Sequence, residues 1–206
     1  MPDLPDAASA EIARLRRELA EARGRIAQLE SLVDEDTLIP VANRRAFVRE
    51  LGRTIAFAER YGFPSSILYF DVDNLKQIND RYGHPAGDAV LCRVAAVLLE
   101  NTRTSDLVGR LGGDEFGVIL VRTTREQAER RAAALAATIA AAPLRWSGIA
   151  IPISASYGLY TFVGKDDPQV ALDAADQAMY RHKRRNVAEP PRRRARVKQA
   201  PGGSRR

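Results

Sequence analysis

Two adjacent carboxylates, Asp114 and Glu115, provide the clearest potential for chemistry in the chain, because a Gly-Gly pair precedes them between two apolar runs. Residues 107–111 and 116–121 have the pattern of two strands, so the glycines fall where a hairpin reverses and where positive φ is useful. Glycine also lets a polyphosphate approach the backbone closely, which makes Gly113 a candidate substrate contact. We interpret the segment as a metal and phosphate site, with a plain hairpin turn carrying solvated acids as the alternative.

A second acidic segment follows a short apolar run about forty residues upstream. Residues 66–70 have the pattern of a central strand, which ends directly in Asp71, Val72 and Asp73. Mg²⁺ takes oxygen ligands, commonly one or two carboxylates together with substrate phosphates, so a strand-end Asp facing a hairpin Asp is sufficient to hold it. Asp71 and Asp114 are therefore candidate ligands, against the alternative that Asp71 only ends a strand in a turn.

A longer pattern surrounds these acids. It contains Asp-x-Asp, a Lys five residues after the first Asp, Asn-Asp, Gly-His and Gly-Asp within residues 71–88, then Arg-x-x-Asp and Arg-Leu-Gly-Gly-Asp-Glu-Phe. Further matching segments are residues 43–47, 156–158, 175–180 and Lys183. The pattern resembles the GGDEF domain of the bacterial diguanylate cyclase family and covers about residues 34–187.

The resemblance implies metal and catalytic roles for the acidic residues. Asp71, Asp114 and the carbonyl of Val72 would hold Mg²⁺, which Mn²⁺ could replace. Glu115 would orient or deprotonate the 3′-hydroxyl of GTP and could also touch a second metal ion. A carboxylate beside a dication is normally ionised and suited to accept a proton, and the choice of base between Asp114 and Glu115 stays open.

The resemblance also implies that Asn79 and Asp88 read the guanine. A carboxylate accepts from the ring N–H and the amino group, while an Asn amide both donates and accepts, so adenine would leave these groups unpaired. His84 would lie close by, with stabilisation of its own turn as the alternative role.

Phosphate contacts are implied for two lysines and one loop. Lys76 and Lys183 would meet the β- and γ-phosphates, with help from the backbone N–H groups near Asn74 and Leu75. For Lys183 the alternative is a solvated helix face, because its surroundings are strongly basic. The spacing after Lys183 departs from the family pattern, so Arg185 would stand in for the family's phosphate-binding arginine across a shortened turn.

The reaction implied by the resemblance is the condensation of two GTP molecules into cyclic di-GMP, with pyrophosphate leaving. Such transfers depend on positioning and charge neutralisation, and each half-site would present one GTP, so the active site would span a homodimer. Arg103 and Asp106 match the family's inhibitory site, where product binds. The alternative is a GGDEF domain with weak or no catalysis that acts as a receptor for GTP or cyclic di-GMP. The intact Asp114–Glu115 pair argues against it.

Residues 1–33 carry a heptad seam, which predicts a short parallel coiled coil that would hold the dimer together. The alternative is a single amphipathic helix lying on its own domain. The seam consists of Ile12, Leu15, Leu19, Ala22, Ile26, Leu29 and Val33.

Beyond the coil, residues 34–187 predict one α+β domain. Because a hairpin stands at its centre, we expect a mainly antiparallel sheet flanked by helices, in agreement with the palm-like fold of the family. The expected elements are helices at 43–60, 86–101, 125–141 and 168–186, strands at 66–71 and 150–162, and a hairpin at 106–121.

Charge is concentrated in residues 188–206, where seven Lys and Arg residues face one Glu, so the net charge of +6 resides in a basic tail that we expect to be disordered. The domain itself is not basic. A nucleic-acid adaptor that uses the tail is a further alternative, but no aromatic-lined basic groove in the sequence supports it. The chain shows no membrane-spanning apolar run and no signal-peptide pattern, so we expect a cytoplasmic protein. Cys92 is expected to be a buried small residue.

Overall fold

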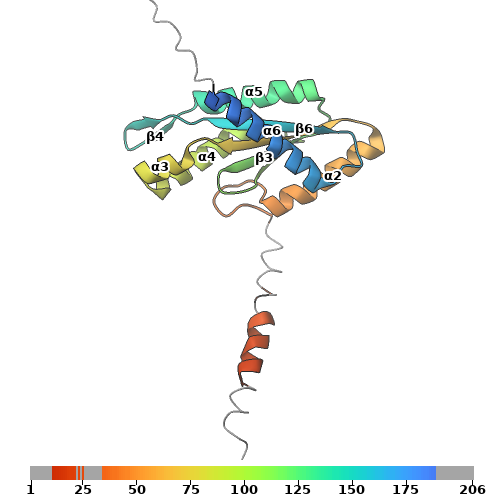
Figure 1. The fold of residues 1–206 in the computed structure, drawn as a ribbon, viewed down its shortest axis with the longest axis vertical. Coiled ribbons are helices and arrows are strands. Elements are labelled where there is room, and N and C mark those ends of the chain that lie inside the picture. Colours follow the sequence, from red (N-terminus) through yellow and green to blue (C-terminus); the bar gives the residue numbers. More distant parts are fainter. Residues whose placement is uncertain (1–10, 22, 24, 26–33, 189–206) are drawn as a thin grey trace, which may run out of the picture.

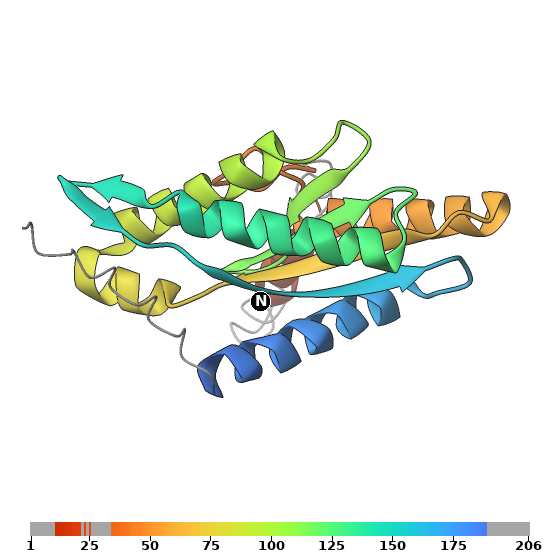
Figure 2. The same cartoon turned by 90° about the horizontal axis from the view of Figure 1, so that it is seen from above.

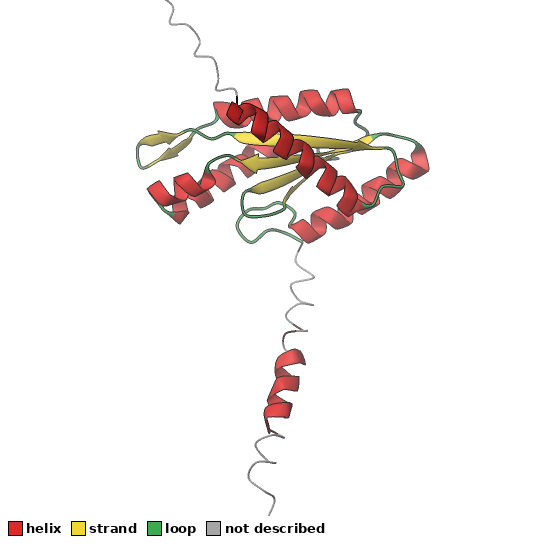
Figure 3. Ribbon diagram, viewed as in Figure 1, coloured by secondary structure: helices red, strands yellow, loops and turns green. Residues whose placement is uncertain are grey.

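The structure is a computed structural model that describes residues 11–21, 23, 25 and 34–188, with the side chains of 185–188 excluded (Figure 1). A four-stranded sheet forms its centre, with strand order β2 (Leu107–Arg110), β3 (Glu115–Leu120), β1 (Ser65–Val72) and β6 (Ala155–Phe162). Every neighbouring pair in this sheet is antiparallel, and helices flank the sheet (Figure 3). The predicted α+β class is therefore confirmed.

Helices cover both faces of the sheet (Figure 2). On one face, α3 (Leu75–Tyr82), α4 (His84–Glu100) and α5 (Arg125–Ala141) pack against one apolar cluster. On the other face, α2 (Arg44–Tyr61) and α6 (Pro168–Ala188) pack against a second cluster.

Strand β1 is covered on both sides, which explains why its sequence is almost continuously apolar. Leu68 and Phe70 belong to the cluster under α3, α4 and α5, whereas Ile67 and Tyr69 belong to the cluster under α2 and α6. Because side chains alternate along a strand, Asp71 continues the second set and lies on the face that α6 covers.

Capping residues mark where the main helices begin and end. Asn43 caps α2 by accepting from the Ala46 amide, and the helix ends at Gly62 in the left-handed region with φ of 69°. A capping box between Thr124 and Gln127 starts α5. The observed bounds of α2, α4, α5 and α6 lie within about two residues of the expected ranges.

Two elements differ from the sequence prediction. The segment after β1 contains α3, which was not predicted, because it has eight residues and buries only Leu75 and Ile78. The single strand expected at 150–162 is broken, since Pro152 cannot donate to a ladder and separates β5 (Ile149–Ile151) from β6. Strand β5 instead pairs with β4 (Leu144–Trp146) in a separate two-stranded hairpin.

Cys92 is exposed on α4, so the expectation that it is buried was wrong. Apolar residues occur on most sides of α4, so the sequence pattern does not show which face of the helix meets solvent.

At the amino terminus, residues 11–21 are helical, and Ile12, Leu15 and Leu19 are each 51% exposed. Ala22, Ile26, Leu29 and Val33 of the heptad seam, like the basic tail from residue 189, lie outside the described residues, so the coil stays a prediction. Among the residues that the structure describes, no helix is long and apolar enough to cross a bilayer.

Candidate active site

Strand pairing brings the two acidic segments together. Asp71 at the end of β1 lies directly opposite Glu115 at the start of β3. The Val72 amide donates to the Asp114 carbonyl at 2.9 Å, which extends the ladder beyond the paired residues. The Leu111 amide closes the hairpin on the Glu115 carbonyl at 2.8 Å. Two segments about forty residues apart in the chain therefore present their carboxylates at one edge of the sheet.

The hairpin glycines are explained by the absence of a side chain and not by an unusual backbone conformation. Neither Gly112 nor Gly113 has positive φ, so that part of the sequence interpretation was wrong. A Cβ atom on Gly112 would lie 2.2 Å from Oε2 of Glu115, which shows that the carboxylate folds over this residue. A Cβ on Gly113 would meet nothing within 4 Å, which leaves its backbone open to a ligand.

Arg110 braces the tip of the hairpin, a role that was not predicted. Its Nε donates to the Gly112 carbonyl at 3.1 Å and its Nη2 to the Gly113 carbonyl at 2.8 Å. Nη1 pairs with Asp36 at 3.1 Å, and both of these side chains are largely buried. An arginine directly before the glycines was a visible signal, but only the structure shows that its fork reaches two successive carbonyls.

Lys183 pairs with Asp71, one of the acids predicted to hold a metal ion. Its Nζ donates to Oδ1 of Asp71 at 2.5 Å, from α6 across the face of the sheet. Burial raises the pKa of the Asp71 carboxyl, and the charges of Asp114 and Asp73 add to this, so together they outweigh the lowering effect of Lys183. Burial would lower the pKa of Lys183, but the hydrogen bond with Asp71 and the three carboxylates raise it overall. The cluster is therefore rich in negative charge and favours an additional cation.

The donor set fits a magnesium ion that is shared with a substrate. Within the described part of the chain, no group of three or more His, Cys, Asp or Glu side chains forms a complete metal cage. Mg²⁺ does not require one, because it is commonly held by one or two carboxylates with substrate phosphates and water. Asp71, Asp114 and the Val72 carbonyl meet that need.

Asp73 is not available to a metal in the same way. Its two carboxylate oxygens accept from the Ser154 and Ser156 hydroxyls at 2.8 and 2.9 Å, and its amide donates to the Ser154 carbonyl at 2.9 Å. It therefore fastens the end of β1 to β6.

The residues expected to read guanine lie together where α3 meets α4. Oδ1 of Asn79 is the one buried side-chain nitrogen or oxygen, among the residues described, that lacks a hydrogen-bond partner. A Cβ on Gly87 would lie 1.9 Å from this oxygen, so the glycine makes room for it. Asp88 follows on α4 with an exposed side chain, and His84 is exposed at the start of the same helix. An unpaired buried acceptor is costly unless a ligand satisfies it.

The loop expected to hold phosphate turns sharply at the end of β1. Asn74 adopts the left-handed conformation with φ of 60° and precedes α3, whose first residue, Leu75, is buried. Lys76 follows with an exposed side chain. The side chain of Arg185 lies outside the described part of α6, so its expected role stays a prediction.

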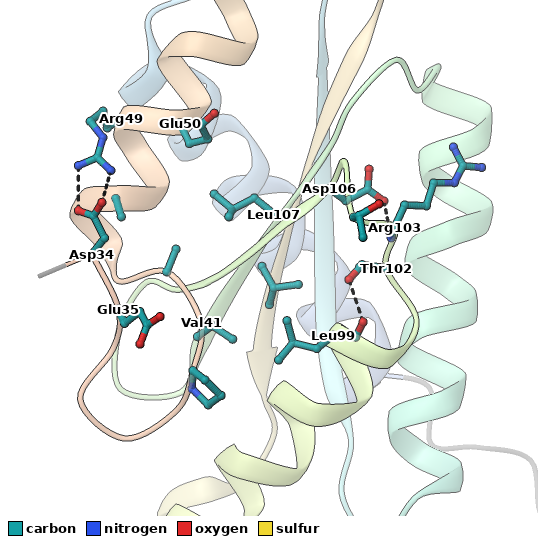
Figure 4. Close-up of a pocket in the computed structure, with 15 residues that line it drawn as sticks. Asp34, Glu35, Val41, Arg49, Glu50, Leu99, Thr102, Arg103, Asp106 and Leu107 are labelled. Carbon is teal, nitrogen blue, oxygen red and sulfur yellow. Dashed lines mark hydrogen bonds and ion pairs between the residues drawn. The ribbon is translucent and has the colours of Figure 1, made fainter.

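The Arg103–Asp106 segment forms a separate region. The Asp106 carboxylate is 3% exposed and accepts from the Arg103 amide at 3.1 Å and from Arg131 of α5 at 3.4 Å. Arg131 was not predicted, because it lies 25 residues further along the chain. A cavity of about 500 Å³ opens beside this segment, with Asp34 and Arg49 among the residues on its other side (Figure 4). A neighbouring cavity of about 260 Å³ is lined by four arginines: Arg103, Arg122, Arg130 and Arg131.

Comparison with known proteins agrees with this geometry. The family model described as "Diguanylate cyclase, GGDEF domain" matches residues 33–188. Diguanylate cyclase DgcP from Pseudomonas aeruginosa is 37% identical over 149 residues, which are 72% of this chain and 22% of that protein. Diguanylate cyclase DosC from Escherichia coli is 38% identical over 154 residues, which are 74% of this chain and 34% of that protein. The chain thus spans about a fifth to a third of the length of these relatives.

Solved structures show the same similarity. The GGDEF domain of TpbB (YfiN) from Pseudomonas aeruginosa superposes with a TM-score of 0.70 at 38% identity, covering 73% of this chain and 89% of that one. The coiled coil and GGDEF domain of DgcB from Caulobacter crescentus, in complex with c-di-GMP, has a TM-score of 0.70 at 26% identity and covers 86% and 95%. The matching sequence, fold and arrangement of acids lead to one conclusion: this chain belongs to the GGDEF family of diguanylate cyclase domains.

Proposed function

We propose that the chain is a diguanylate cyclase that condenses two GTP molecules into cyclic di-GMP and two pyrophosphates. The observation that carries this proposal is the antiparallel pairing of β1 and β3, which sets Asp71 opposite Glu115 with Asp114 beside them. A receptor that only binds nucleotide would not need this concentration of carboxylates around one lysine.

GGDEF cyclases use a divalent metal ion, and we assign it as Mg²⁺, with Mn²⁺ as a substitute. Asp71, Asp114 and the Val72 carbonyl would hold it, and bound there it neutralises charge on the triphosphate. The positive charge of Lys183 lies at the same acids, within reach of a phosphate that approaches them. Lys76 and the amides of Asn74 and Leu75 face the phosphates from the start of α3.

The chemical step requires a proton acceptor and an aligned nucleophile. The 3′-oxygen of one GTP forms a bond to the α-phosphorus of the other, the bond from that phosphorus to pyrophosphate breaks, and the proton of the hydroxyl passes to a carboxylate. We assign the acceptor as Glu115, since its carboxylate folds over Gly112 at the open tip of the hairpin. Asn79 and Asp88 select guanine, because the Asn79 acceptor and the Asp88 carboxylate match its N–H and amino donors.

Two copies of the domain must face each other to close the ring. The hairpin tip is exposed at Gly113, so a second subunit can present its own GTP there. We propose that the amino-terminal coil holds the two chains together, supported by the exposure of Ile12, Leu15 and Leu19 on the described helix. Product inhibition is proposed at Arg103 and Asp106, beside the cavity of about 500 Å³.

The test is a turnover assay with purified protein, GTP and MgCl₂, in which pyrophosphate and cyclic di-GMP are measured separately. We expect both products in a ratio of about two to one, since two transfers close one ring. Glu115→Ala should abolish them while circular dichroism and Tm stay close to those of the wild type. Folded, dimeric protein that binds GTP without forming either product would contradict the proposal and leave a nucleotide receptor.

A further inference from the structure

The part of α6 that carries Lys183 extends past the buried core. Among the side chains that the structure describes, Met179 is the last one of α6 that belongs to a core cluster. Gly158 of β6 allows close packing at that point, since a Cβ there would lie 2.0 Å from the Met179 backbone nitrogen. Lys183 follows one turn later and pairs with Asp71 on β1. Because helix ends fray where core contacts stop, the place of Lys183 depends on contacts beyond Met179.

An aromatic pair lies in this part of the helix. The ring of His182 stacks on the ring of Tyr157 in β6, with centroids 4.5 Å apart and ring planes inclined by 38°. This separation is within the range in which aromatic pairs stabilise a structure. Both side chains are partly buried.

The stack lies at the edge of the sheet. Strand β6 is the outermost strand and runs beside α6 (Figure 2). Because side chains alternate along a strand, Tyr157 points away from the face on which Gly158 meets α6. Helix α6 therefore contacts β6 in two ways, through its backbone on one face and through the His182 ring at the edge.

Tyr157 is in turn fixed to the strand that carries Asp71. Its cross-strand partner is Phe70, which is completely buried, and the centroids of these two rings are 6.0 Å apart. Phe70 directly precedes Asp71 in β1. A series of ring contacts thus leads from β1 through Tyr157 to His182, and the next side chain of α6, that of Lys183, returns to β1 at Asp71.

We propose that His182 is a positioning residue: through its stack on Tyr157 it fixes the end of α6, so that Lys183 stays at Asp71 and at a triphosphate that binds there. This role rests on the proposed function, which assigns Lys183 to the phosphates of GTP. His182 acts through Lys183 and not by contact with the nucleotide. A lysine has a long, flexible side chain, so the place of its ammonium group depends on how firmly its helix is held.

Three variants separate the ring contact from other effects. His182→Ala removes the stack, whereas His182→Phe keeps an aromatic ring and should restore it. Tyr61→Ala is the matched control, because Tyr61 forms a pair with Phe57 on α2 whose ring centroids are also 4.5 Å apart. Neither residue of that pair has a part in the proposed site.

The first measurement needs neither nucleotide nor turnover. Hydrogen exchange of the backbone amides of residues 180–184 is followed in the purified full chain without GTP. We expect His182→Ala to lower their protection by about threefold or more, at the scale of one lost aromatic pair. Alanine is the better helix former, so helix propensity alone would change protection in the opposite direction. His182→Phe and Tyr61→Ala should keep the protection of the wild type.

The second measurement is steady-state turnover with GTP and MgCl₂, at a temperature at which circular dichroism shows all variants folded. His182→Ala should raise KM for GTP by about fivefold and keep kcat within about twofold, because a phosphate contact made before and during the reaction is weakened. His182→Phe should restore KM to within about twofold of the wild type, and Tyr61→Ala should not change it.

The outcomes separate this role from the proposed function. Unchanged protection in His182→Ala, or an equal loss in Tyr61→Ala, would overturn the positioning role and leave the cyclase proposal intact. Lower protection with an unchanged KM would also overturn it, because the helix end would then not matter for GTP. If the folded wild type forms no cyclic di-GMP, the cyclase proposal is wrong, and the exchange experiment still shows whether His182 fixes the helix end.

Discussion

Two regions differ in how many of their polar groups have hydrogen-bond partners within the chain. One is the proposed nucleotide region, around Asp71, Asn79 and Lys183, and the other is the Arg103–Asp106 region. In the proposed nucleotide region Oδ1 of Asn79 is buried without a hydrogen-bond partner. Three carboxylates there, those of Asp71, Asp73 and Asp114, raise the pKa of one lysine, Lys183. In the other region the Asp106 carboxylate is almost wholly buried and accepts three hydrogen bonds from the chain itself, from Arg103, Ser105 and Arg131. The comparison indicates that the first region is arranged for ligands that complete it, whereas a ligand at the second must add to, or replace, bonds that already exist.

The largest effect is expected at the acids of the nucleotide region. Asp71→Asn should lower product formation by about 10²–10³-fold or more, because it removes a proposed metal ligand and a charge that offsets Lys183. The matched control is Asp73→Asn, whose carboxylate is already bonded to two serines, and it should retain more than about a tenth of wild-type turnover. Similar losses in both variants, at comparable Tm, would show that the two acids are not divided in this way.

Filling the space beside the unpaired acceptor should have the next largest effect. Gly87→Ala places a methyl group 1.9 Å from Oδ1 of Asn79 and must displace that side chain. We expect KM for GTP to rise by about tenfold, since a guanine contact is lost. Gly52→Ala on α2 is the control, because its Cβ would meet only Cγ of Pro168 at 3.3 Å. A normal KM in Gly87→Ala would mean that Asn79 does not read the base.

At the second region the effect should fall on inhibition and not on turnover. Arg103→Ala should raise the concentration of cyclic di-GMP needed for half inhibition by about tenfold, because an arginine fork to phosphate or guanine is lost. The initial rate without added product should match the wild type. The measurement is the rate of pyrophosphate release over a series of cyclic di-GMP concentrations, and an unchanged inhibition curve would contradict product binding at this segment.

The smallest effect concerns the dependence of stability on pH in the absence of metal. Burial, and then the charges of Asp114 and Asp73, raise the pKa of Asp71 above its ordinary value of 3.8. In the window from 3.8 up to the raised value the folded state binds more protons at Asp71 than the unfolded state does, so the stability contributed by Asp71 falls as the pH rises through it. Relative to wild type, Asp71→Asn should therefore gain a few degrees of Tm across that window in calorimetry with EDTA. A Tm difference that moves the other way as the pH rises would mean that Lys183 outweighs burial.

The fold class and most elements could be predicted because their signals are local. Alternation and apolar runs indicated β1, the β2–β3 hairpin and four of the helices, and the motif spacing placed Asp71 and Asp114 in the same site. Helix α3 is harder to predict, because it is short, it buries only Leu75 and Ile78, and its polar residues also fit a ligand-binding loop. The contributions of Arg110 and Arg131 depend on contacts with residues that are distant in the chain or on another element, and no local pattern indicates which carbonyl or carboxylate each one meets.

The pairing of β1 with β3 also limits how the chain can change in length. Side chains alternate along a strand, so one residue inserted into β1 between Tyr69 and Asp71 would turn the aspartate towards α3 and α4, away from Glu115. The exposed tip at Gly113 lies beyond the last paired residues, and added residues there would leave the ladder in register. Deletions and insertions should therefore be tolerated between Gly112 and Asp114 for folding, while a single extra residue in either strand should eliminate the active site.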